Sequence, residues 1–176
     1  MPASHLTASR CLPALLLLSA CGGGGDNFAP PCPGAAIVRD AADLSRYRGA
    51  GRDLTDAVLD ARITGLGGSC KQDGPSIVST TVQVGMELTR GPAATNRQVE
   101  LAYFVAVVEG ERILDKQVFG VRSEFPANTD KLRLTGDPVE LRLPVTPSKS
   151  ASAYRIQVGF QLTPLELEVN RRRGDR

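Results

Sequence analysis

The sequence has few of the side chains on which catalytic and metal sites usually depend. Tryptophan is absent, and the single histidine is His5. The rest of the chain therefore cannot supply a Ser-His-Asp triad, a Cys-His pair or a histidine-based metal site. Aromatic residues make up only 5% of the chain, and most of them fall in segments expected to form a core. No platform for stacking on sugar rings is visible.

The apolar run near the N-terminus is short. Leu12–Ala20 follows Arg10 and is too short to span a bilayer as a helix, which needs roughly 20 apolar residues. Four glycines, Gly22–Gly25, follow at once and cannot continue regular structure cheaply. This layout predicts a secretory signal over residues 1–20. A short uncleaved apolar tail is the alternative.

The end of this run matches a known processing motif. Leu18-Ser19-Ala20-Cys21 resembles the lipobox of bacterial lipoproteins. The resemblance implies cleavage before Cys21 and a lipid on its thiol, so the expected partner at this residue is a membrane. Gly22 follows the cysteine, and by the sorting rule of enteric bacteria this favours the periplasmic face of the outer membrane. The inner membrane is the alternative. Removal of the signal would also remove the only histidine.

The charge balance excludes one class of partner. The formal net charge is +2 at pH 7, so no strong electrostatic attraction to nucleic acid or anionic lipid is expected.

The four cysteines reduce to one pair. Cys11 lies in the signal and Cys21 is expected to carry lipid, which leaves Cys32 and Cys70. Two remaining thiols usually pair in an oxidising compartment. We expect a disulfide that closes a loop of about 39 residues and stabilises the fold by about 4 kcal/mol. A redox or metal pair is the alternative, but the CxxC spacing is missing.

Alternation of apolar and polar residues dominates the chain from Ala35 onward. A period of two predicts half-buried strands. Glu109-Gly110-Glu111 separates two apolar runs and predicts a hairpin. The run that precedes this turn is apolar on both faces, as expected for a central or doubly covered strand. Seven strands are expected, within Ala36–Arg39, Leu59–Thr64, Val78–Thr89, Val99–Val108, Arg112–Val121, Val139–Val145 and Tyr154–Leu162.

Seven short strands with turn signals between them predict an all-β antiparallel sandwich over residues 35–165, immunoglobulin-like or fibronectin-III-like. A β-barrel is the alternative. Residues 21–34 are expected to form a tether. Thr163-Pro164-Leu165-Glu166 fits a helix start, so residues 166–176 should hold a short helix and a basic tail. One or two helical turns are also expected within Asp40–Arg48. Gly67-Gly68 is expected to form a turn between strands.

The remaining polar residues offer weak signals for chemistry. Asp53, Asp56 and Asp60 lie close in sequence but lack calcium-site spacing. Ser148-Lys149-Ser150 could evoke a Ser-Lys catalytic pair, although a solvated turn is the simpler interpretation. Arg171-Arg172-Arg173 fits a solvated tail, with an anion-binding patch as the alternative. We expect no catalytic residue, no metal ligand and no cofactor.

The chain from Ala35 to Arg171 resembles a group of uncharacterised lipoproteins from alphaproteobacteria. The resemblance rests on five short segments: Cys32-Pro33, Arg52-Asp53-Leu54-Thr55-Asp56, Gly68-Ser69-Cys70, Arg90-Gly91-Pro92-Ala93-Ala94 and Phe160-Gln161-Leu162-Thr163-Pro164. It implies a periplasmic lipoprotein with a β-rich domain and carries over no activity.

Three functions follow as hypotheses. The leading one is a non-enzymatic, membrane-anchored module for protein interaction or envelope assembly, bound to an envelope protein by sheet-edge addition or loop contacts. The second is a module that binds carbohydrate or peptidoglycan. The third is a hydrolase that uses carboxylates alone.

Overall fold

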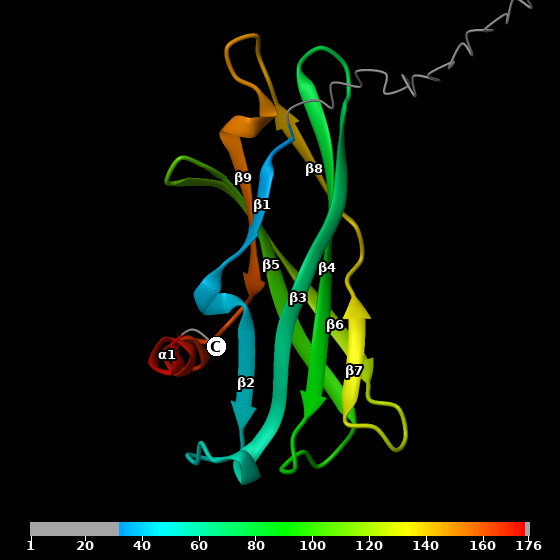
Figure 1. Ribbon diagram of the computed structural model, residues 1–176, viewed down its shortest axis with the longest axis vertical. Coiled ribbons are helices and arrows are strands. Elements are labelled where there is room, and N and C mark those ends of the chain that lie inside the picture. The colour runs from blue at the N-terminus through cyan, green and yellow to red at the C-terminus, as the bar shows by residue number, and fades with distance from the viewer. Residues whose placement is uncertain (1–31, 175–176) are drawn as a thin grey trace, which may run out of the picture.

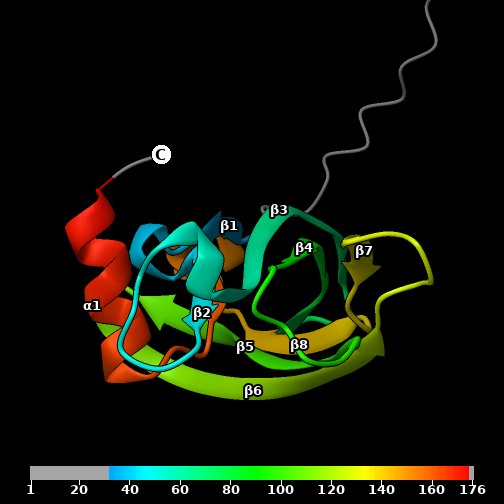
Figure 2. The same ribbon diagram turned by 90° about the horizontal axis from the view of Figure 1, so that it is seen from below.

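Two β-sheets packed face to face make up most of the chain (Figures 1 and 2). The computed structural model describes residues 32–174. One sheet has the order β1-β9-β5-β6, with β1 (Gly34–Ile37), β9 (Tyr154–Phe160), β5 (Gln98–Glu109) and β6 (Arg112–Glu124). The other has the order β2-β3-β4-β7 and contains β2 (Asp43–Tyr47), β3 (Ala57–Gln72), β4 (Ile77–Arg90), β7 (Lys131–Thr135) and β8 (Val139–Pro144), with β8 also paired to β4.

The helical segments are short. Three are single 3₁₀ turns, η1 (Arg39–Ala41), η2 (Leu54–Asp56) and η3 (Ala151–Ala153), and the one α-helix among the described residues is α1 (Pro164–Arg173). The capping box expected at Thr163 is present, with Pro164 at the helix start and reciprocal hydrogen bonds between Thr163 and Glu166. The expectation of a short C-terminal helix is therefore confirmed.

The expectation of a mostly antiparallel two-sheet fold is also confirmed. All strand pairs within residues 32–174 are antiparallel except β1 with β9. The described strands divide into two open sheets, so the barrel alternative is wrong. Residues 32–174 contain nine strands rather than the seven expected, because β2 and β7 were not expected.

Two local expectations need correction. Asp40–Arg48 holds only the η1 turn, and strand β2 follows within the same segment. Gly67 and Gly68 form no turn but lie inside β3, where Gly68 pairs with Val82 of β4. At Gly68 a Cβ atom would lie 2.0 Å from the carbonyl oxygen of Thr81. A glycine here therefore permits close backbone approach within a long strand.

The core lies between the sheets and follows the period-two pattern. The four-stranded sheet contributes Tyr103, Val105, Ile156 and Val158, among others, and the second sheet contributes Leu44, Ile63, Val84, Met86 and Leu88. Each fully buried side chain of this size stabilises the fold by about 1.5–3 kcal/mol relative to exposure. Strand β5, apolar on both faces, is central between β6 and β9 as expected.

Polar contacts fix α1 against the start of the fold. The side-chain amide of Asn170 donates hydrogen bonds of 2.9 and 2.7 Å to the backbone carbonyls of Asp40 and Asp43. The guanidinium of Arg46 forms an ion pair of 3.0 Å with Glu166. The helix thereby covers the side of the sandwich near η1 and β2 (Figure 2).

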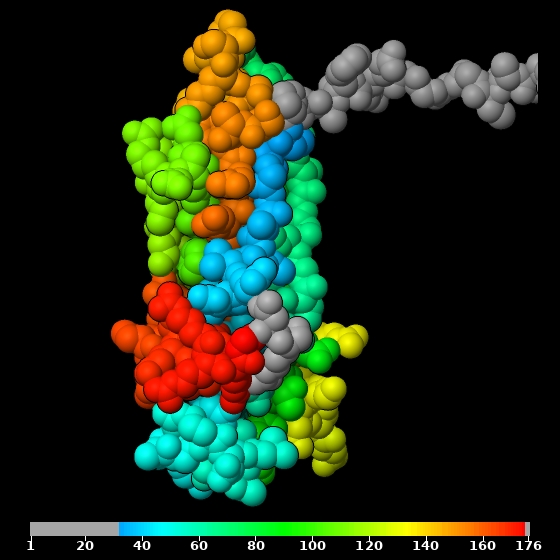
Figure 3. Space-filling view, turned by 60° about the vertical axis from the view of Figure 1, so that its left-hand side comes forward, coloured from blue at the N-terminus to red at the C-terminus, as the bar shows by residue number. Residues whose placement is uncertain are grey.

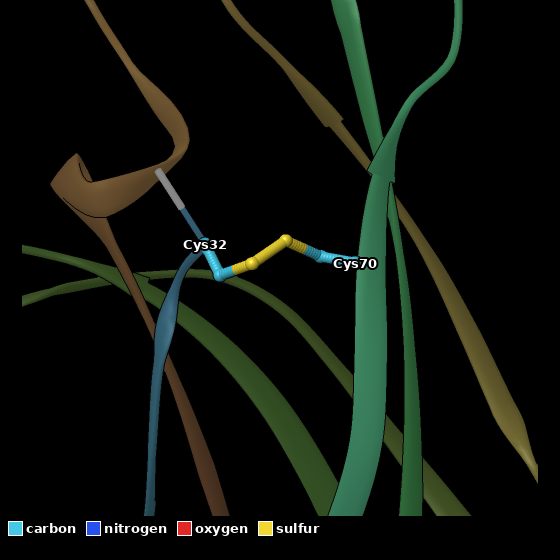
Figure 4. Close-up of a disulfide and its surroundings, with 2 residues drawn as sticks. All are labelled: Cys32 and Cys70. Carbon is cyan, nitrogen blue, oxygen red and sulfur yellow. A yellow bond between two sulfur atoms is a disulfide. The ribbon is translucent and has the colours of Figure 1, made fainter. Parts of the chain in front are cut away.

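The same side is closed further up by the N-terminal strand and a disulfide. Strand β1 lies between β9 and β3 (Figure 3) and contacts β3 of the opposite sheet. Cys32, just before β1, is bonded to Cys70 near the end of β3 (Figure 4), with their Cα atoms 5.9 Å apart. The expected disulfide is present, and it links the edges of the two sheets.

Candidate functional site

The opposite side of the sandwich ends in a long strand without an outer neighbour. Strand β6 spans 13 residues and, among the strands that the structure describes, pairs only with β5. Strands in globular proteins are usually five or six residues long. A free edge of this length presents a row of backbone N–H and C=O groups that can pair with another chain.

The two halves of β6 differ in how well this edge is protected. Near the hairpin, Asp115, Lys116 and Gln117 place polar groups along the strand, and the ladder has a bulge beside Ile113. Charges and bulges of this kind discourage pairing with other strands. The other half, residues 118–123, pairs with β5 without a bulge and carries one charged residue, Arg122. Exposed apolar side chains occur in both halves, at Ile113, Leu114 and Val118. By bulge and charge, residues 118–123 are the less protected part of the edge.

The facing edge of the second sheet is interrupted, and a cleft opens there. Strands β7 and β8 both pair with β4 and follow one line, broken at Gly136-Asp137-Pro138. Gly136 donates a backbone hydrogen bond of 2.9 Å to Val84 but leaves the ladder. Between this interruption and β6 lies a cleft of about 310 Å³, lined by Met86, Tyr103, Phe119, Gly120, Val121, Arg122, Ser123, Leu134, Thr135, Gly136 and Asp137.

Two aromatic rings form the floor of the cleft. Tyr103 of β5 stacks on Phe119 of β6, with ring centroids 5.3 Å apart and the planes inclined by 24°. Tyr103 is buried, whereas Phe119 is partly exposed. Burial, with a smaller contribution from the negative charge of Asp137, raises the pKa of Tyr103. The ring therefore stays uncharged at neutral pH and acts as an apolar surface with one polar tip.

The charges around the cleft are unevenly matched. Arg122 is held by Glu100 at 2.9 Å, and Arg133 of β7 by Glu87 at 3.0 Å. Asp137, by contrast, has no arginine or lysine partner within the described chain. It is exposed and lines the mouth of the cleft. The cleft thus combines aromatic and aliphatic walls with one unmatched negative charge.

The cleft and the strand edge together form a candidate binding surface. It contains no paired nucleophile and base, and among residues 32–174 no three His, Cys, Asp or Glu side chains lie close enough to hold a metal ion. A free strand edge beside a small cleft with both apolar and polar walls is compatible with strand addition, in which main-chain hydrogen bonds give affinity and side-chain pockets give specificity.

The residues singled out in the sequence lie elsewhere. Asp60 accepts a hydrogen bond from the hydroxyl of Ser45 on the outer face of β3. Asp53 precedes η2, and Asp56 is its last residue. Lys149 binds Glu109 and lies over the ring of Tyr154, at 4.4 Å from its centroid.

These contacts argue against the Ser-Lys interpretation. The hydrogen bond to Glu109, followed by the one to Tyr154, raises the pKa of Lys149. A lysine that acts as a general base needs a lowered pKa.

The arginine run at the end of α1 is used within the molecule. Arg171 lies 3.2 Å from Asp40, Arg172 pairs with Glu168, and Arg173 donates a hydrogen bond of 2.8 Å to Ser45. The contacts of Arg171 and Arg173 help to fix the helix against η1 and β2, whereas the pair of Arg172 with Glu168 lies within the helix. The side chains of Arg171 and Arg172 are largely exposed.

The expected lipidation residue, Cys21, lies outside the described residues, as does most of the tether that was expected over residues 21–34. Comparison with family models, curated proteins and solved structures found no match. Within the described segment, none of the helices has the length and apolar character needed to cross a bilayer.

Sequence reasoning identified β6 as a strand but missed the site. The apolar stretch Val118–Val121 was visible, yet its place at a sheet edge depends on strand order. Asp137 stands in a Gly-Asp-Pro segment that predicts a turn, and nothing local indicates that it faces the aromatic floor formed by β5 and β6.

Proposed function

We propose that this protein is a non-enzymatic interaction module that binds a partner protein of the bacterial envelope by strand addition at β6. The observation that carries the proposal is the free edge of residues 118–123 on a 13-residue strand. Natural sheets usually shorten, charge or cover such edges. Here the first half of β6 is protected in this way and the second half is not.

The fold supports the same proposal through its topology, which we relate to the immunoglobulin and fibronectin-III sandwiches. The order β3-β4-β7/β8 corresponds to strands A-B-E of that architecture, and β6-β5-β9 to C′-C-F. In this correspondence β1 occupies the position of strand G beside β9 but runs parallel to it. Sandwiches of this kind host many binding functions, although the fold alone does not determine one.

The cellular location of the module is also part of the proposal. A lipid on Cys21 would anchor the chain at the periplasmic face of the outer membrane, with the inner membrane as the alternative. The disulfide between Cys32 and Cys70 supports an oxidising compartment. Intact mass of the membrane-extracted protein tests the anchor: the expected species begins at Cys21 and carries acyl mass, and an unmodified cysteine would contradict it.

A photocrosslinking experiment tests partner binding. A photoreactive amino acid is placed at Val118, on the exposed half of the β6 edge, or at Thr64, an exposed position on β3. In intact cells, irradiation should give an adduct of defined mass from Val118 and none from Thr64. Equal labelling at the two positions, or no adduct at either, would reject the binding of an envelope partner at β6.

A further inference from the structure

The structure around β6 also indicates the chemistry of the segment that would bind there, an inference that rests on the proposed function. We propose that the site takes an extended peptide segment of another protein, with a bulky apolar side chain next to a lysine or arginine on the same face. The strand edge, the cleft and the charge of Asp137 together point to this segment.

Strand alternation determines which side chains of an added segment reach the cleft. Phe119 and Val121 of β6 face Tyr103 and Leu101 of β5, so they point toward the core side of the sheet. A segment that extends the sheet beyond β6 places every second side chain on that same side. These inward side chains would lie over the cleft, and the others would face solvent.

The size and walls of the cleft favour a bulky apolar group. Its volume of about 310 Å³ is at the lower end of the range for small-molecule pockets. Val121, Leu134 and the ring of Phe119, all partly exposed, provide apolar contact surface. A large aliphatic or aromatic side chain that enters this space removes apolar area from water, the main source of affinity in small pockets.

Charge indicates the residue beside it. Asp137 lies at the mouth of the cleft without a basic partner in residues 32–174, while neighbouring charged groups such as Arg122 are already paired. A lysine or arginine two residues from the bulky apolar residue, and so on the same face of the added strand, would lie near the Asp137 carboxylate. A surface ion pair of this type mainly adds specificity.

A second copy of the chain fits the site less well. Antiparallel pairing of two β6 strands centred on Val118 would set Asp115 of one copy opposite Val121 of the other. Val121 lines the same cleft as Asp137. This arrangement would bring two carboxylates to one small apolar site, and like charges there disfavour pairing.

Synthetic peptides test this inference with the detergent-solubilised full chain. The probe is the acetylated, amidated peptide Thr-Val-Thr-Phe-Thr-Lys-Thr, and its counterpart carries Glu in place of Lys. We expect fluorescence anisotropy to show the Lys peptide binding about fivefold more tightly than the Glu peptide. In Asp137→Lys this preference should disappear or reverse. Glu140→Lys, the same charge change at an exposed position of β8 outside the cleft, should leave the preference intact.

Backbone methylation tests the mode of binding. Successive amides of a strand point to opposite edges. Two versions of the Lys peptide, N-methylated at odd or at even positions, should therefore differ: one set should abolish binding and the other should preserve it. Equal loss in both versions, no detectable binding of the Lys peptide, or a preference that survives Asp137→Lys would overturn the inference.

The outcomes separate this inference from the proposed function. A Val118 adduct in cells together with failure of the peptides would retain strand addition but reject the assigned peptide chemistry. An adduct between two copies of this chain would reject a foreign segment in favour of self-association. If the Lys peptide binds but no adduct forms in cells, the inferred peptide chemistry is supported and the proposed binding of an envelope protein is rejected.

Discussion

Removal of the disulfide gives the most direct quantitative test of this fold. The double variant Cys32→Ser/Cys70→Ser opens a covalent loop between residues separated by 38 positions. The chain-entropy relation for a loop of this length gives about 4 kcal/mol of stabilisation, because the bond restricts the unfolded chain. Typical domains have a free energy of unfolding of about 5–15 kcal/mol. The variant should therefore lose a large fraction of its stability.

The structure adds a local expectation to this global one. Strand β1 has only four residues and one strand neighbour, β9. Beyond the ladder, the backbone of Val38 donates one further hydrogen bond of 2.8 Å to Val158. Without the covalent link to β3, so short an edge strand should open more often than the central strands. Backbone amides of residues 35–38 should lose protection first.

Urea unfolding and thermal unfolding of the oxidised protein, the reduced protein and the double variant provide the assay. The reduced protein and the variant should agree with each other, and their thermal midpoints should lie about 8–16 °C below that of the oxidised protein. Hydrogen exchange should place the largest local change in β1. A loss below about 1 kcal/mol, or unchanged exchange in β1 relative to β5, would refute the conclusion that the disulfide restrains both the unfolded chain and this edge.

Three further predictions concern single side chains. The hydroxyl of Thr80 is buried without a hydrogen-bond partner in the described residues. Thr80→Val should therefore raise the free energy of unfolding by about 1–2 kcal/mol. If urea unfolding shows a lower free energy of unfolding for the variant, the hydroxyl has a partner. Gly68→Ala should lower that free energy by more than about 1 kcal/mol, because its Cβ would collide with a carbonyl of β4, whereas Gly67→Ala has open space; equal effects would contradict the close approach. For Glu166, burial raises the pKa, but hydrogen bonds from Thr163 and Arg46 outweigh it, so the pKa lies below the ordinary value. Its stabilising effect should be complete above about pH 4.3 and lost as the pH falls through the lowered pKa. The stability difference from Glu166→Gln should shrink in acid, and a pH-independent difference would argue against the charged contact.

Local pattern was sufficient for much of the fold because a period of two reports which face of a strand is buried. It predicted β4, β5 and β9 and the hairpin into β6, and the cap of α1 was visible in Thr163 and Glu166. It missed β2, which has too few alternating residues to outweigh a helical interpretation. The alternation of Leu132 and Leu134 could have revealed β7, but five residues give a weak signal.

The disulfide could be predicted from the sequence, whereas the candidate site could not. Pairing of Cys32 with Cys70 followed from counting cysteines, since only two remained for each other. The site depends instead on strand order and on the break at Gly136-Asp137-Pro138. Those features bring Asp137 beside rings that lie more than fifteen residues away in sequence, and no local pattern records such proximity.

The bond between Cys32 and Cys70 also determines how the domain would carry mechanical load. Tension applied to the chain before Cys32 divides there between β1 and, through the sulfur atoms, β3. Strand β1 offers four residues of ladder, whereas β3 is paired with β4 from Leu59 to Gln72. Part of the pull therefore passes to the longest ladder among the described strands instead of resting on the shortest strand alone. In a domain held to a surface by its N-terminal segment, this division of load would oppose peeling of the sandwich from its first strand.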